Sequence, residues 1–176
     1  TEEQVMSMDL SQYRVVAFAT HGLVAGDLDG LYQPALALSN PKLTKGDGDG
    51  LLMLGEILGL SLKADWVVLS ACNTAAADGE GAEAVSGLGR AFFHAGTRAL
   101  LVSNWPVHST ATRVLTTTLF KNQSQDATLT RAEALRQARL HLINTATFKT
   151  ASGKTLFSYA HPIFWVPFTI VGDGGV

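Results

Sequence analysis

The sequence is poor in cysteine and in charge, and each shortage excludes a class of protein. Its 176 residues include one cysteine, Cys72, so no intrachain disulfide can form and a disulfide-stapled secreted fold is excluded. Charged residues make up 16% of the chain and hydrophobic residues 47%, a composition that favours a packed core over disorder. The formal net charge of −2 does not match the basic balance of nucleic-acid-binding domains, so no directly bound nucleic acid is expected.

Long hydrophobic runs and targeting signals are also missing. The longest apolar stretch, Leu51 to Leu62, is interrupted by Gly55 and Glu56, so no segment approaches the length of a membrane-spanning helix. The chain begins at Thr1 without the basic and apolar regions of a signal peptide. These absences predict a cytoplasmic protein without a membrane partner.

The sign of the charge changes along the chain. Residues 1–83 hold 12 acidic and 4 basic residues, a balance of −8, whereas residues 84–176 hold 3 acidic and 9 basic residues, a balance of +6. Such a split indicates either two partners or one fold whose loops differ in sign. The length suits one domain over residues 1–176.

Hydrophobic patterning predicts that strands alternate with helices. Near-continuous apolar strands are expected at residues 13–20, 66–71 and 98–104, and a last strand at 165–171. Apolar strands of this kind belong to parallel sheets that are covered on both faces, so the fold class is α/β. Helices are expected at residues 51–60, 82–94 and 109–121 and, from a capping box, after Thr130; residues 34–39 are expected to form a short strand or hairpin arm.

The first two strands are each followed by a residue that suits nucleophilic catalysis. His21 follows the first strand and Cys72 the second, and catalytic groups gather beyond the carboxyl ends of parallel strands. An imidazole beside a thiol generates the thiolate and later protonates a leaving amine. Taken singly, Cys72 is better explained as a buried structural thiol and His21 as an ordinary strand-end histidine. The two together favour a catalytic pair.

Other motifs do not lead to a cofactor or a metal. Residues 79–84 fit G-x-G-x-x-A, but seven residues separate them from the strand and the acidic partner about 20 residues further on is missing. The GDGDG turn at residues 46–50 lacks the last acidic ligand of a calcium loop. The remaining histidines show no spacing typical of metal ligands. Arg131, Arg136 and Arg139 are expected on a solvated helix face.

Five ordered sequence blocks carry a resemblance to a known family. They are ATHG at residues 19–22, VVLSACNTA at 67–75, GEGAEAVSGLGRAFFHAG at 79–96, LLVSNWPV at 100–107 and HPIFWVPFTIVGD at 161–173. Together they resemble the CHAT family of caspase-like domains, which are often fused to tetratricopeptide repeats. The chain departs from many members at Ala17, where they carry a second histidine, and at His108, where they carry an acid. The β-α segment that usually opens the family domain is expected upstream of residue 1.

The resemblance implies a fold and an activity. The fold is a caspase-like three-layer sandwich in which helices flank a mostly parallel central sheet. The activity is that of a cysteine endopeptidase without a cofactor, in which His21 and Cys72 form the catalytic dyad and the substrate is a protein or peptide. The domain is then the protease module of a larger regulated protein, with a TPR-like repeat domain in the parent protein or in a partner chain.

The resemblance also implies further site residues. The backbone N–H groups of Gly22 and Cys72 are expected to hold the oxyanion. The pocket for the substrate residue before the cut is expected to include Ser70, Ser103, Asn104 and Trp105, none of which is charged. Apart from the resemblance, acids cluster on the two catalytic loops, Asp27 and Asp29 after His21 and Asp78 and Glu80 after Cys72, and they are expected to form an acidic rim that favours basic substrates. Some of these residues have a simpler explanation: Gly22 also fits an ordinary turn, the acids fit a solvated loop, and Trp105 fits a core.

Two other functions stay open on the sequence. A catalytically silent caspase-like module that binds a partner in signalling keeps the same motifs. A nucleotide-binding module is the third hypothesis, and it predicts a thermal shift with nucleotide.

Overall fold

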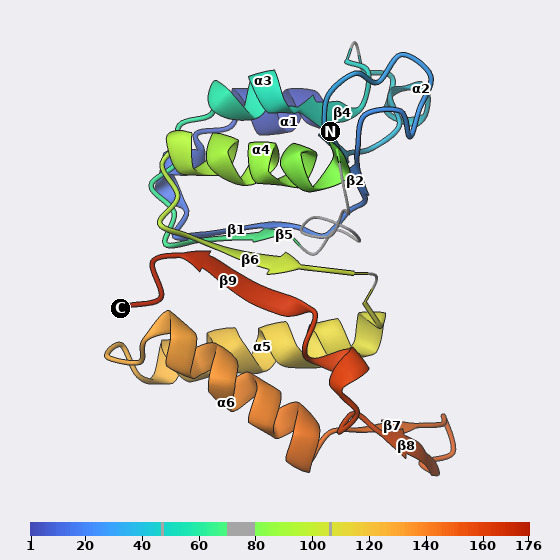
Figure 1. Cartoon of the computed structure of the whole chain (residues 1–176), viewed down its shortest axis with the longest axis vertical. Helices are drawn as coiled ribbons and strands as arrows, with labels where there is room; N and C mark the ends of the chain where they lie inside the picture. The colour runs from blue at the N-terminus through green and yellow to red at the C-terminus, as the bar shows by residue number, and fades with distance from the viewer. Residues whose placement is uncertain (47, 70–79, 106) are drawn as a thin grey trace. The chain divides into compact units, whose positions relative to one another are not determined.

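The computed structural model describes residues 1–46, 48–69, 80–105 and 107–176, and of residues 80–86 it describes the backbone alone (Figure 1). The chain divides into two compact units, Thr1–Pro106 and Val107–Val176. In the part of the chain that the structure describes, no helix combines the length and the hydrophobicity needed to cross a bilayer.

A parallel sheet forms the centre of the first unit. Its strands β1 (Val15–Phe18), β5 (Trp66–Leu69) and β6 (Ala99–Ser103) lie side by side in that order, and both pairings are parallel (Figure 1). Every residue of β5 and β6 is buried, which explains their continuous apolar sequences. The three predicted strands are confirmed, the first and the third with shorter bounds, and of the second the structure describes Trp66–Leu69. So is the fold class, an α/β fold with a mostly parallel central sheet flanked by helices, consistent with a caspase-like sandwich.

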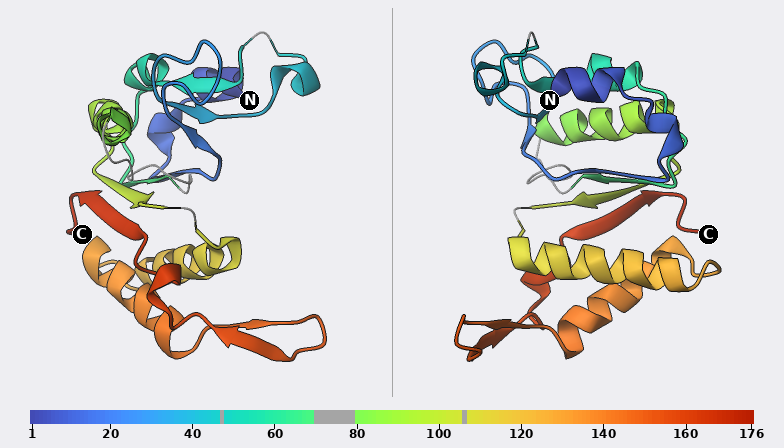
Figure 2. Two further views of the ribbon diagram at one scale, coloured as in Figure 1. Left: turned by 45° about the vertical axis from the view of Figure 1, so that its right-hand side comes forward. Right: turned by 180° about the vertical axis from the view of Figure 1, so that it is seen from behind.

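Three helices cover one face of this sheet. They are α1 (Glu2–Ser7), α3 (Leu54–Leu58) and α4 (Glu80–His94), as Figures 1 and 2 show from three directions. The ring of Phe92 on α4 lies 5.4 Å from the ring of Phe18 on β1, and both side chains are buried. Burial of such apolar side chains is the main stabilising contribution to this unit.

The prediction of a helix over residues 51–60 is wrong in its first part. Residues Leu51–Met53 form the strand β4, and the helix α3 begins at Leu54. The reason is tertiary, because Leu52 lies opposite Leu36 in an antiparallel pairing and neither side chain is exposed. Burial against that neighbouring strand outweighs the local helical spacing of the apolar residues.

A small antiparallel sheet joins β4 to the loop after β1. Its order is β2 (Gly22–Leu23), β3 (Ala35–Ala37) and β4, so the predicted hairpin arm at residues 34–39 is confirmed as its middle strand. The short helix η1 (Leu10–Gln12) precedes β1, and the short helix α2 (Pro41–Thr44) lies in the connection between β3 and β4. This sheet determines where the residues that follow β1 are placed.

The second unit begins with two helices that pack against each other, α5 (Ser109–Gln125) and α6 (Arg131–Asn144). The hairpin β7 (Thr147–Lys149)–β8 (Thr155–Ser158), which the sequence did not predict, follows α6, and the turn η2 (Pro162–Phe164) comes next. The strand β9 (Phe168–Gly172) comes last. The predicted last strand begins three residues too early, because Trp165 N–H donates to the Pro162 carbonyl and ends η2.

The expected capping box on α6 is only half present. The Thr130 hydroxyl accepts from Glu133 N–H at 3.2 Å, as predicted. The Glu133 carboxylate, however, is turned toward Arg136, with two hydrogen bonds of 2.7 Å, and toward Gln137 at 3.0 Å. Hydrogen bonds from Arg136 first and from Gln137 second lower the pKa of Glu133 to about 2.

The prediction that the arginines of α6 share a solvated face is wrong for Arg131, whose side chain is 2% exposed. Its guanidinium donates to the Gly175 carbonyl at 2.9 Å, and its backbone N–H donates to the same carbonyl at 2.9 Å. Arg139 is also partly buried, and it donates to the Phe168 carbonyl. Both arginines tie β9 and the residues after it to α6, a role that spacing along the helix does not reveal.

His108, the departure from the family pattern, has a structural role at the start of α5. Its Nδ1 accepts from Ala111 N–H at 3.4 Å and so caps the helix. The imidazole also contacts aromatic rings from the hairpin, from the residue that follows it and from η2, with centroid distances of 5.7 to 6.1 Å; they are Phe148, Phe157, Tyr159 and Phe164.

Candidate active site

The carboxyl edge of the parallel sheet is where the two proposed catalytic residues follow their strands. Phe18 and Leu69 are partners in the β1–β5 register, so the chain leaves both strands at the same level. His21 is the third residue after Phe18, and Cys72 is the third residue after Leu69. Cys72 itself lies outside the described residues, as does Ser70, so the structure describes only the histidine side of the predicted pair.

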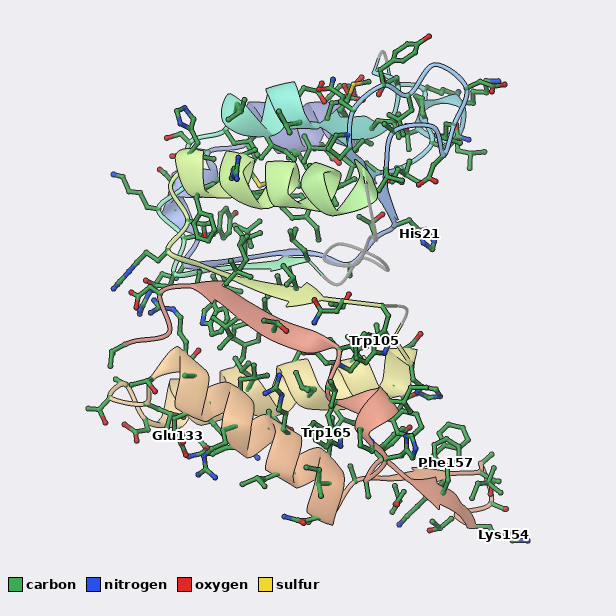
Figure 3. All side chains as sticks on the ribbon, in the orientation of Figure 1. His21, Trp105, Glu133, Lys154, Phe157 and Trp165 are labelled. Atoms are coloured by element: carbon green, nitrogen blue, oxygen red, sulfur yellow. The ribbon has the colours of Figure 1, made fainter. Side chains whose placement is uncertain are left out.

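His21 occupies the short connection between β1 and β2. Its side chain is exposed, and Figure 3 shows it pointing away from the sheet. The imidazole makes no hydrogen bond to any residue in the described ranges, so both ring nitrogens are open to a reactant. A general base needs such access, because it must reach the proton that it removes.

The backbone of His21, in contrast with its side chain, is held firmly. The His21 carbonyl accepts from Ala37 N–H at 2.8 Å, and the Thr20 hydroxyl donates to the Ala37 carbonyl. Ala37 belongs to β3, whose residues Ala35 and Leu36 have no exposed surface. The connection that carries the histidine is therefore attached to a buried strand.

Alternation along β2 determines the direction of the Gly22 N–H. Gly22 pairs with Leu36, and the preceding residue His21 accepts from Ala37, so His21 and Ala37 form the hydrogen-bonded pair. In an antiparallel ladder the next pair is not hydrogen-bonded, and its N–H groups point outward. The Gly22 N–H therefore points away from β3, toward the side on which β2 has no partner strand among the described residues.

The two acids of the predicted rim differ in their contacts. The Asp27 carboxylate accepts from Val24 N–H at 2.8 Å, and Asp27 N–H donates to the Val24 carbonyl at 3.1 Å, so Asp27 closes a turn. Asp29 is exposed in the same loop. The turn explains Asp27 without a ligand, whereas Asp29 has the free carboxylate that an acidic rim requires.

The end of β6 supplies the other predicted substrate contacts. Ser103 is fully buried, whereas Asn104 and Trp105 directly after it are partly exposed. Trp105 lies where the chain leaves the strand (Figure 3). Exposure at the carboxyl edge suits Asn104 and Trp105 as groove residues better than it suits Ser103.

The structure adds one residue that the sequence analysis did not single out, Thr20. In the sequence it is only one residue of the ATHG block, yet its hydroxyl is bonded to the strand that also holds His21. A hydroxyl residue directly before a catalytic histidine is the signal that was available in the sequence, but its partner Ala37 becomes visible only in the fold.

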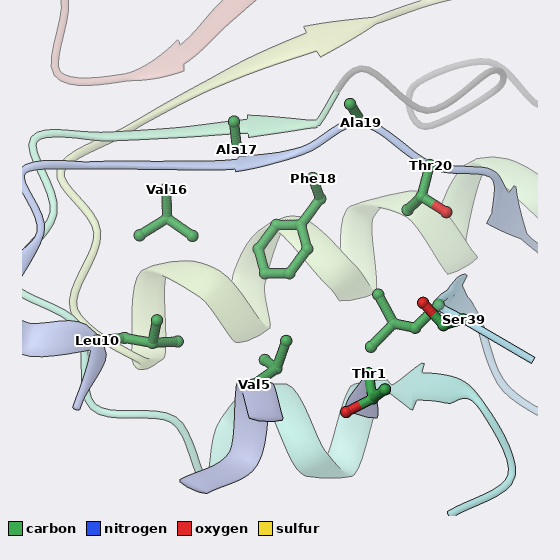
Figure 4. Close-up of a pocket in the computed structure, with 10 residues that line it drawn as sticks. Thr1, Val5, Leu10, Val16, Ala17, Phe18, Ala19, Thr20 and Ser39 are labelled. Atoms are coloured by element: carbon green, nitrogen blue, oxygen red, sulfur yellow. The ribbon is translucent and has the colours of Figure 1, made fainter. Parts of the chain in front are cut away.

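A cavity of about 500 Å³ lies between β1 and the N-terminal helix (Figure 4). Val5, Leu10, Val16 and Phe18 supply apolar walls, and Thr20 is among the lining residues. The cavity therefore lies behind the strand that leads to His21.

Among the residues the structure describes, no group of three His, Cys, Asp or Glu side chains is placed to bind a metal ion.

Comparison with known families and proteins bears on this site. The model of the CHAT domain matches residues 1–173, which is nearly the whole chain, so the resemblance expected from the five sequence blocks is confirmed. No curated protein matches the chain.

Proposed function

The chain belongs to the CHAT domain family, a caspase-like and peptidase-related family, and on this premise we propose that it is a cysteine endopeptidase with a His21–Cys72 dyad. The observation that carries the proposal is the β1–β5 register, which brings the chain to His21 and to Cys72 from the same level of two neighbouring parallel strands. We further propose that it is the protease module of a larger cytoplasmic protein that is regulated by a TPR-like region.

The proposed reaction begins with proton transfer from the Cys72 thiol to the His21 imidazole. The thiolate sulfur attacks the scissile carbonyl carbon, and the carbonyl oxygen becomes an oxyanion. The imidazolium then gives its proton to the leaving amine as the C–N bond breaks. Water, deprotonated by His21, hydrolyses the thioester and restores the thiol.

The outward Gly22 N–H supports the oxyanion role of this residue. A hydrogen-bond donor serves the tetrahedral intermediate only if it is not used within a sheet, and the pairing of β2 leaves this donor unused. The missing side chain of glycine also allows a substrate backbone to approach closely. Cys72 N–H is the second proposed donor.

The substrate pocket is proposed from Ser70, Ser103, Asn104 and Trp105. The partly exposed Trp105 forms a wall of the groove, and Asn104 offers an amide to the substrate backbone. The free carboxylate of Asp29 favours a basic substrate residue nearby. Asp27 contributes to this rim by shaping the turn rather than by direct contact.

The test is cleavage of a peptide library by the purified chain, with the Cys72→Ala variant in parallel. We expect the parent to cleave and the variant to lose essentially all cleavage, because Cys72 is the one cysteine of the chain and supplies the thiolate of the proposed dyad. Equal cleavage by parent and variant contradicts the dyad. If the parent cleaves nothing and its thiol resists alkylation until the chain unfolds, the silent partner-binding module is the better account.

A further inference from the structure

The imidazole of His21 has no described hydrogen bond that sets its direction. It is exposed, and no residue in the described ranges makes a hydrogen bond to it. Where a catalytic side chain lacks a partner, its reach is determined by the backbone from which it projects. The contacts of the residues around His21 therefore decide where a proton can be taken up.

Ala37 holds this backbone at two points. Its N–H donates to the His21 carbonyl at 2.8 Å, and its carbonyl accepts from the Thr20 hydroxyl. The first bond continues the β2–β3 ladder. The second bond comes from the Thr20 side chain. It takes the place of the backbone N–H bond that the ladder would otherwise make to the Ala37 carbonyl. Thr20 thus extends the attachment of this segment by one residue, back toward β1.

The strand on the other side of this contact is anchored in the core. Leu36, next to Ala37, has no exposed surface, and it lies opposite Leu52, which is also fully buried. On the other side of Ala37, Leu38 N–H donates to the Gly50 carbonyl at 2.7 Å. Ala37 is therefore a fixed point, and a bond to it restricts the segment that carries His21.

We propose that Thr20 is a positioning residue of the reaction proposed above: its hydroxyl, bonded to the Ala37 carbonyl, fixes the backbone from which the His21 imidazole reaches the thiol and the substrate. Threonine suits this task because its β-branched side chain has few rotamers, so the hydroxyl is held in place before the bond forms. This inference rests on the proposed peptidase function. It adds a residue to that function.

The test compares Thr20→Val, which keeps the shape and removes the hydroxyl, with Thr20→Ser, which keeps the hydroxyl. A matched control is Thr97→Val. The Thr97 hydroxyl is also bonded to backbone carbonyls, those of Ala99 at 3.2 Å and Ala64 at 3.4 Å, but it lies at the amino end of β6. Each variant is measured for kcat and KM on a cleaved peptide, for the rate of Cys72 alkylation by iodoacetamide, and for Tm.

We expect Thr20→Val to lower kcat by about 10- to 100-fold, because a displacement of about 1 Å at a catalytic group can slow a reaction about 100-fold. KM should stay near the parent value, alkylation of Cys72 at neutral pH should slow in the same variant, and Thr20→Ser should recover most of both rates. Thr97→Val should lower Tm while its kcat and alkylation rate stay those of the parent.

Two results contradict the inference in different ways. If Thr20→Val alkylates and cleaves like the parent, or loses no more rate than Thr97→Val at the same Tm, Thr20 has a structural role only and the dyad stands. A His21→Ala variant in the same alkylation series tests the proposed function itself. If it alkylates as fast as the parent, the proposed function fails, and the positioning role fails with it.

Discussion

The two ends of the parallel sheet in the first unit are built from different interactions. At the amino end, Asp65 binds the Arg14 side chain at 2.5 Å and lies 3.6 Å from Arg98, so one carboxylate connects the residues that precede β1 and β6. At the carboxyl end, the His21 imidazole is exposed and has no hydrogen bond to a described residue. The amino end therefore uses its charged groups within the fold, and the carboxyl end leaves a titratable group for a reactant.

The turn before β6 shows how far the amino end depends on close packing. Gly96 has φ +107°, and a Cβ atom at this position would lie 2.2 Å from the Leu62 carbonyl oxygen. That carbonyl belongs to the backbone and cannot move aside as a side-chain tip can. Residues at the amino end therefore stabilise the fold, whereas residues at the carboxyl end are available for the proposed chemistry. Mutations at each end can test this division of roles.

The largest effect is expected for His21→Ala at the carboxyl end. Removing the general base from the proposed dyad should lower kcat/KM by roughly 10³-fold or more. The free energy of unfolding should change little, because the side chain is exposed and unbonded among the described residues. Peptide cleavage and chemical denaturation of the same preparation measure both. A large loss of stability without a specific loss of cleavage rate would contradict this division of roles between the two ends.

Gly96→Ala should give the opposite pattern. The forbidden contact with the Leu62 carbonyl and the left-handed backbone should lower the free energy of unfolding by about 3 kcal/mol. The peptide-cleavage rate per folded molecule should stay that of the parent. Denaturation curves give the stability, and active-site titration by a thiol reagent gives the folded fraction. Gly55→Ala is the matched control, since nothing lies within 4 Å of a Cβ at that position.

Asp65→Asn should have a smaller effect at the same end. Its carboxylate is mostly buried, but Arg14 and Arg98 are well exposed, so the two ion pairs are screened by solvent. A loss of about 1 kcal/mol in the free energy of unfolding is expected, and it should shrink in high salt. Cleavage should proceed at the parental rate. A stability that is independent of salt would show that the ion pairs do not hold this end.

The smallest effect is expected for Asp29→Asn in the loop after β2. Removing its exposed charge should lower kcat/KM roughly threefold for peptides with Lys or Arg near the cut, and only at low ionic strength. Neutral peptides should be cleaved as before. Asp27→Asn is the comparison, because that carboxylate closes a turn and its loss should act on all peptides alike. Equal effects of Asp29→Asn on basic and neutral peptides would contradict the proposed preference for basic substrate residues.

Local pattern was enough for the strands that lie in the interior. The sequences of β5 and β6 are apolar without interruption because both faces of each strand are buried, and this leaves little choice of element. The helix ending before Gly96 was also predictable, since the glycine has the positive φ that ends a helix. The order of the motifs then placed His21 and Cys72 after two apolar strands.

Pattern failed where a distant partner decides the structure. Leu52 has apolar neighbours at helical spacing, yet pairing with Leu36 makes it part of a strand. Arg131 lies among polar residues on a helix, yet its side chain is buried against the chain end through the Gly175 carbonyl. In both cases the energy comes from burial and hydrogen bonds to residues far away in the sequence, which no window along the chain contains.

The amino-acid sequence alone specifies the fold class through its continuous apolar strands, the family through its five ordered blocks, and the candidate dyad through the residue types that follow two of the strands. Only the tertiary structure decided what holds the histidine: the contact of Thr20 and His21 with Ala37, and the outward direction of the Gly22 N–H. The physical reason is that strand register and the alternation of hydrogen-bonded pairs arise from pairing between segments. The identity of a residue does not specify which edge of a strand its N–H group faces.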